Sequence, residues 1–242
     1  MIKKENFPLK SNRIDMFTPE TLSRAKNILV VSSPEPSPYQ SLIDNRNKDT
    51  RIMEKLVLED KIFENGFSLE IDVQRYLIDA KYSSKIDRKI LLQIPKSHRC
   101  IYNYTLPQDV SFDIFKEFNK FKDYLLSKFK KKKGKEGTES YLTPRYYEEQ
   151  TPELFKQGQR VLYWGKTAKN ADKRNFQHIT GLTSTKKKSK VHSGSSLRLG
   201  QWYDGLITLT IYDFGPEISI SGLSEIESYF HKNFRPLIGK RE

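Results

Sequence analysis

A short apolar run that ends at a glycine and leads into a helical pattern constrains this sequence most. The run extends from Val161 to Trp164 and contains β-branched and aromatic residues, as is typical of a buried strand. Asn170 is a suitable N-cap and Gly181 a suitable C′ residue, so residues 171–180 are predicted to form a helix. The chain is therefore expected to pass from a strand, through a glycine, into a helix.

This strand–helix junction carries side chains that suit a phosphodiester. Tyr163 and Lys166 lie at the end of the predicted strand. Arg174 and His178 are four residues apart, so they share one face of the predicted helix. The cationic groups would neutralise a phosphate, and the tyrosine would supply a hydroxyl near the reacting centre.

The junction resembles the second half of the GIY-YIG nuclease signature. Tyr163-Trp164-Gly165 stands where that family has Tyr-Ile-Gly, and Arg174 and His178 match its R-x-x-x-H helix. Lys166 follows the glycine directly. The order and spacing of these residues carry the resemblance, which covers residues 141–239.

The C-terminal part of the sequence is similar to the last element of the same family. That element is a glutamate, then a hydrophobic helix, then an aromatic-x-Pro turn, and it matches Glu227, Phe234 and Pro236. Gly239 stands where the family often has an asparagine. The resemblance implies that Glu227 binds the single divalent metal of the site, Mg²⁺ or Mn²⁺. A second interpretation of Glu227 is structural, because it would be the N3 residue of a capping box that begins at Ser224.

The first tyrosine of the family signature has two candidates in this chain. Tyr147 has a suitable spacing to Tyr163, although no glycine precedes it. Tyr102 lies in Cys100-Ile101-Tyr102, which is closer to Gly-Ile-Tyr but requires a long insertion before Tyr163. We take Tyr147 as the preferred interpretation. The resemblance implies that a tyrosine is the general base, while His178 either shares that role or hydrogen-bonds a tyrosine hydroxyl.

The predicted fold class is α+β, in two regions. Residues 135–242 are expected to form a small GIY-YIG-type nuclease domain, with a short central antiparallel sheet flanked by helices. Residues 1–134 are expected to form an α/β region that binds DNA and mediates dimerisation. The boundary is placed at Lys135 to Ser140, a polar, glycine-containing stretch typical of a linker.

Hydrophobic periodicity predicts the remaining elements. Strands are expected at 67–76, 90–94, 100–106, 206–212 and 217–221. Helices are expected at 112–129 and 225–234, the first of them carrying an aromatic stripe along one face.

The composition favours a nucleic-acid partner and a reducing compartment. The net charge of +13 and the pI near 9.5 indicate attraction to polyanions, foremost double-stranded DNA. The longest apolar runs are too short to cross a membrane. The single cysteine excludes an internal disulfide framework, so a cytoplasmic location is expected.

These observations together predict a Mg²⁺-dependent DNA endonuclease, most similar to a small type II restriction enzyme. Cutting both strands of a symmetric site requires two active sites, hence a homodimer or a higher symmetric oligomer. The alternatives are a phage or repair nicking nuclease of the same fold and a catalytically inactive, basic nucleic-acid-binding protein.

Overall fold

The protein is described from a computed structural model, which covers residues 48, 51, 66–133, 150–183 and 196–239. The chain divides into two compact units, Met1–Glu59 and Asp60–Glu242. Every strand and every helix discussed below belongs to the second unit. Tyr147 and the linker at residues 135–140 lie outside the described residues.

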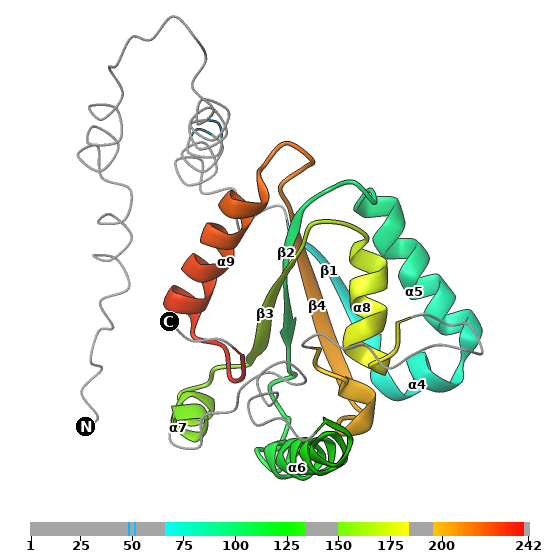
Figure 1. Ribbon diagram of the computed structural model, residues 1–242, viewed down its shortest axis with the longest axis vertical. Helices are drawn as coiled ribbons and strands as arrows, with labels where there is room; N and C mark the ends of the chain where they lie inside the picture. Colours follow the sequence, from blue (N-terminus) through cyan, green and yellow to red (C-terminus); the bar gives the residue numbers. More distant parts are fainter. Residues whose placement is uncertain (1–47, 49–50, 52–65, 134–149, 184–195, 240–242) are drawn as a thin grey trace, which may run out of the picture. The chain divides into compact units, whose positions relative to one another are not determined.

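A four-stranded antiparallel sheet forms the centre of the second unit (Figure 1). Its strands are β1 (Phe67–Asp72), β2 (Cys100–Thr105), β3 (Val161–Thr167) and β4 (Leu206–Asp213). They lie in the order β1-β4-β2-β3, so β3 is an edge strand beside β2.

Helices surround this sheet, which confirms the α+β class. They are α4 (Val73–Ile78), α5 (Ala80–Gln93), α6 (Ile114–Lys133), α7 (Gln150–Lys156), α8 (Ala171–Thr180) and α9 (Ile220–Phe234), with a short 3₁₀ turn, η2 (Leu199–Gln201). The prediction of α8 is confirmed at both ends, because Asn170 precedes it and Gly181 follows it in the left-handed conformation.

The sheet separates α8 from α9, and the alternation of side chains along β3 explains how (Figure 1). Tyr163 faces α8, where its ring lies 5.3 Å from that of His178. Trp164, the next residue, faces α9 and packs against Phe230 at 4.4 Å between ring centroids. Successive strand residues point to opposite faces, so one strand contributes to two packed layers.

Two predicted strands are in fact wholly or partly helical. Residues 90–94 were expected to form a strand, but they belong to the end of α5 and its C-cap. Ile86 and Ile90 are buried one turn apart on this helix, and Asp79 caps it by accepting the amides of Lys81 and Tyr82. A short apolar run is compatible with a strand or with a helix. The N-cap at Asp79, seven residues before Ile86, shows that this run belongs to a helix.

The strand predicted at 67–76 is correct only as far as Asp72. Its side chain accepts the Arg75 amide and starts α4. An N-cap of this kind overrides the apolar alternation that continues into Val73.

The closing helix starts earlier than predicted. α9 begins at Ile220, where the Ser219 side chain accepts the Gly222 amide, so residues 220–221 are helical and the strand predicted at 217–221 is wrong. Ser224 is therefore inside the helix and is not its N-cap. The capping-box interpretation of Glu227 is wrong for the same reason, because that residue lies two turns into α9.

The two predicted regions contribute to a single sheet. β1 and β2 come from before residue 134, yet both pair with β4, and β2 also pairs with β3. A polar, glycine-containing stretch marks a surface segment, but it carries no information about which distant strands pair across it. No helix in the described part of the chain is long and apolar enough to cross a membrane.

Candidate active site

Tyr102 is at the centre of the candidate site. It lies on β2 directly opposite Gly165 of β3, in an antiparallel register that also places Tyr104 opposite Tyr163. A Cβ atom on Gly165 would lie 2.6 Å from the Tyr102 hydroxyl oxygen and 2.8 Å from Cε1 of Tyr163. The glycine therefore leaves the space that the two tyrosine side chains occupy.

The hydroxyl of Tyr102 contacts both functional residues of α8. Arg174 donates from Nε to the Tyr102 oxygen at 3.0 Å, and His178 Nε2 lies 2.7 Å from the same oxygen. Arg174 and His178 were expected at the strand–helix junction. Tyr102 was expected only as the alternative to Tyr147 for the first tyrosine of the family signature. The signal that identifies it is Cys100-Ile101-Tyr102, whose pairing with β3 spans the long segment that contains α6 and α7.

The second imidazole nitrogen of His178 determines which proton the ring carries. The backbone amide of Leu197 donates to Nδ1 at 3.0 Å. An amide N–H can only donate, so Nδ1 is the unprotonated nitrogen, and a neutral His178 carries its proton on Nε2. The imidazole therefore donates to Tyr102, whose oxygen receives two hydrogen bonds, one from each α8 side chain.

Tyr163 is buried beside this pair. Its ring lies 5.3 Å from that of His178 and 6.5 Å from that of His231 on α9. Gly239, which replaces the asparagine of the family pattern, approaches the same ring, since a Cβ there would lie 3.2 Å from Tyr163 Cδ2. Tyr163 thus packs between α8 and the C-terminal segment.

Lys166 and Glu227 form an ion pair on the α9 side of β3. Lys166 Nζ lies 2.8 Å from Glu227 Oε2 and donates to Ser224 Oγ at 2.8 Å. The Ser224 hydroxyl donates to the Ile220 carbonyl at 2.8 Å, which leaves its oxygen free to accept the lysine proton. The two acceptors lie one turn apart on α9 and hold the ammonium from two directions.

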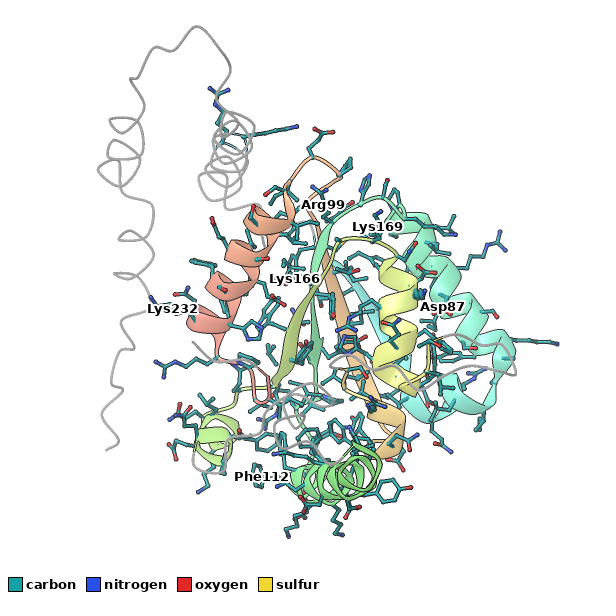
Figure 2. All side chains as sticks on the ribbon, in the orientation of Figure 1. Asp87, Arg99, Phe112, Lys166, Lys169 and Lys232 are labelled. Atoms are coloured by element: carbon teal, nitrogen blue, oxygen red, sulfur yellow. The ribbon has the colours of Figure 1, made fainter. Side chains whose placement is uncertain are left out.

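The expectation that one strand–helix junction gathers all the site residues on one side needs correction. Tyr163 and Lys166 are three residues apart on β3, so strand alternation sends them to opposite faces of the sheet. The site therefore extends across the edge strand at Gly165, with Tyr102 and Arg174 on the α8 side. Lys166, labelled in Figure 2, lies with Glu227 on the α9 side.

The electrostatics connect the two sides. Burial raises the pKa of Tyr102, and the charge of Arg174 and its hydrogen bond act in the opposite direction. The negative charge of Glu227 also raises the pKa of Tyr102. Burial is the largest cause of the raised pKa of Tyr163, and the charge of Glu227 adds to it. The charge of Glu227 therefore opposes the ionisation of both hydroxyls.

A second polar group lies beneath the site and was not anticipated from the sequence. Tyr104 donates to Asn175 Oδ1 at 3.0 Å, and Tyr76 donates to Asp87 Oδ1 at 2.6 Å. Burial raises the pKa of Asp87 to about 6, and the hydrogen bond from Tyr76 acts in the lowering direction. Asn175 lies between Arg174 and His178 in sequence, so this group fixes the helix turn that presents them.

Comparisons of the chain with models of protein families, with curated proteins and with solved structures return no match.

One carboxylate is available to a metal ion at this site. Glu227 is 21% exposed, and its Oε2 contacts Lys166. Among the described residues, no group of three or more histidine, cysteine or acidic side chains could enclose a metal. Mg²⁺ keeps several waters and often binds through one or two carboxylates plus substrate phosphates. A single, partly exposed carboxylate beside a cation therefore fits an ion that is completed by substrate and water, and does not fit a closed structural metal site.

The arrangement can bind an anion and remove a proton near it. Arg174 and Lys166 supply positive charge on the two sides of Gly165, whose missing side chain leaves room for the rings of Tyr102 and Tyr163. Tyr102 is a hydroxyl with two fixed donors on its oxygen, which stabilise its deprotonated form. This combination suits attack of water on a phosphate ester.

Proposed function

We propose that the protein is a Mg²⁺-dependent endonuclease that hydrolyses phosphodiester bonds of double-stranded DNA. The observation that supports this most is the Tyr102 hydroxyl, which receives Arg174 Nε and contacts His178 Nε2 directly opposite Gly165. The arrangement resembles the GIY-YIG signature, with Tyr102 in place of the first family tyrosine. Tyr147, the residue first preferred for that position, lies outside the described residues.

Tyr102 is the general base in this proposal. Tyr102 first loses its proton to solvent. A water proton then moves to the tyrosinate oxygen while the water oxygen bonds to phosphorus, the bond to the leaving oxygen breaks, and the leaving oxygen takes a proton from solvent. His178 stays a donor throughout, because the Leu197 amide occupies its Nδ1. Burial keeps Tyr102 protonated in the free protein, and its pKa would fall when the negative charge of Glu227 is neutralised.

The other residues bind and orient the phosphate. Arg174 and Lys166 neutralise its oxygens, on the α8 and α9 sides of β3 respectively. Glu227 holds the metal ion, which would supply charge for the phosphate and the leaving oxygen. Tyr163 packs against His178 and limits the position of the water.

The biological context proposed is a small type II restriction enzyme of the cytoplasm. Double-strand cleavage of a symmetric site requires a homodimer or a higher symmetric oligomer. A phage or repair nicking nuclease would use the same site as a monomer. The alternative that is not an enzyme is an inactive DNA-binding protein. The ion pair between Lys166 and Glu227 favours this alternative, because the lysine already neutralises the carboxylate that would bind the metal ion.

The test is cleavage of a supercoiled plasmid in Mg²⁺ and in EDTA. Tyr102→Phe, Arg174→Ala and Glu227→Ala should each abolish cutting, while the folded state, followed by circular dichroism, persists. Linear product without a nicked intermediate indicates concerted double-strand cleavage, and nicked product alone indicates the nicking enzyme. Full activity of Glu227→Ala would eliminate the metal assignment, and an inactive wild type would favour the DNA-binding protein.

A further inference from the structure

Three basic residues surround the end of the sheet at which β2 begins and β3 ends. Lys96 and Arg99 precede β2, and Lys169 follows β3. Cys100 pairs with Thr167, so the starting residue of one strand lies beside the last residue of the other. We call Lys96, Arg99 and Lys169 the basic sheet end. Figure 2 shows Arg99 and Lys169 at the same end of the sheet.

Backbone hydrogen bonds hold these residues in place. Asn170 donates its amide to the Lys96 carbonyl at 3.1 Å, which joins the segment before β2 to the start of α8. Arg99 donates its amide to the Gly215 carbonyl at 3.0 Å and accepts the Phe214 amide at 2.9 Å. Main-chain contacts with neighbouring elements therefore set the positions of Lys96 and Arg99, and the Thr167 hydroxyl holds Lys169 by donating to its carbonyl at 2.6 Å and accepting its amide at 3.3 Å.

The charges of the basic sheet end are available to a ligand. None of its three residues forms an ion pair within the described part of the chain, and the side chains of Lys96 and Lys169 are exposed. On α6, by contrast, Lys116 and Lys120 pair with Asp113 and Glu117. The carboxylate beside the basic sheet end, Asp213, already contacts His98 Nδ1 at 2.7 Å and accepts the Gly215 amide.

We infer that the basic sheet end binds backbone phosphates of duplex DNA on one side of the bond that the candidate site cuts. This inference rests on the proposed function. Arg99 lies three residues before Tyr102, about 10 Å along an extended strand. DNA rises about 3.4 Å per base pair, so this distance corresponds to roughly three nucleotides from the scissile phosphate. Contacts of this kind position the duplex without reading its sequence.

The experiment measures binding of the full-length protein to a duplex oligonucleotide in EDTA over a range of NaCl concentrations. The test variant is Lys96→Ala/Arg99→Ala/Lys169→Ala. The matched control is Lys81→Ala/Lys85→Ala/Lys89→Ala, which removes three exposed lysines from one face of α5 and the same formal charge. Each lost phosphate contact lowers the slope of log K against log salt by about 0.9, so the test variant should lose about 2 to 3.

The result expected is a selective loss. The test variant should bind at least about tenfold more weakly at 0.15 M salt, and the α5 control should change little. Equal losses in both variants, or none in either, would overturn the inference. A selective loss of binding in a protein that does not cleave with Mg²⁺ would uphold the surface and reject the nuclease, so the two failures are distinct.

Discussion

The hydroxyl oxygen of Tyr102 lies 2.7 Å from Nε2 of His178, whose Nδ1 already accepts the Leu197 amide at 3.0 Å. A neutral imidazole held in this way donates to the tyrosine and has no lone pair left to take a proton. The pair therefore has a direction: the histidine donates to the tyrosine oxygen and would stabilise a tyrosinate, which in our proposal takes the proton of water and becomes neutral tyrosine.

This direction predicts different effects for two substitutions of His178. Glutamine keeps an N–H donor near the position of Nε2, so His178→Gln should retain cleavage within about tenfold of wild type. His178→Leu removes the donor and should lose about 100-fold, the scale of a positioned donor to a developing oxyanion. Single-turnover cleavage rates measure both, with thermal melting to compare stability. If the glutamine variant were as inactive as the leucine variant, histidine would be the base.

Gly165 is predicted to be intolerant of even one added methyl group. In Gly165→Ala the new Cβ would meet the Tyr102 hydroxyl at 2.6 Å and Tyr163 at 2.8 Å, both below any normal contact distance. We expect a loss of about 1–3 kcal/mol in the free energy of unfolding from overpacking, and a loss of cleavage well beyond that seen for equally destabilised variants elsewhere. Urea unfolding and cleavage rates on the same samples test this. A variant with wild-type activity would show that the hydroxyl of Tyr102 can move without consequence.

Local sequence signals predicted the elements around the site better than their pairing. The run from Val161 and the helix bounded by Asn170 and Gly181 each carry their information within a few neighbouring residues. The helix was predicted correctly, and the strand starts where predicted but continues through Gly165 to Thr167 instead of ending at the glycine. Tyr102 was placed second to Tyr147 because nearness in sequence was taken as a guide to nearness in space. Strand pairing is set by long-range packing, so Tyr102 and Tyr163 lie on paired strands although about sixty residues separate them in sequence.

The role of Glu227 shows the same limitation. The sequence offered a capping box and a metal ligand, and the helix start that separates these interpretations lies at Ser219, eight residues earlier. The hydrogen bond of Tyr76 to Asp87 was not predicted at all, because two separate helices, α4 and α5, create it and neither carries a motif. Sequence reasoning therefore proposed candidate residues, and their partners are set by the tertiary structure.

Ser224 is predicted to act through Lys166. Its hydroxyl is the second acceptor for the lysine ammonium and would keep that group in place when Glu227 binds a metal ion. Ser224→Ala should reduce the cleavage rate about tenfold, the value of one hydrogen bond to a charged group. In a Lys166→Ala background the same change should have no further effect. Ser228→Ala, one turn further along α9, serves as the control. Additive losses from Ser224→Ala and Lys166→Ala would contradict the coupling.

Asp87 is predicted to make the protein less stable as the pH rises from about 4 to about 7. Burial raises its pKa in the folded state to about 6, above the value of 3.8 in an unfolded chain. The folded protein therefore binds the proton more tightly, so this contribution is fully present below pH 4 and is lost as the pH passes through 6.

Asp87→Asn keeps an acceptor for Tyr76 and removes the titration. We expect it to raise the free energy of unfolding at pH 7.5 by roughly 1–2 kcal/mol, a value reduced for partial solvent screening, and to flatten its pH dependence. Urea unfolding between pH 5 and 8 provides the measurement, with Asp123→Asn on the exposed face of α6 as the control. A wild type whose stability rises with pH over this range, while the Asp87→Asn profile has the same slope, would show that the carboxyl is ionised and well solvated in the folded protein.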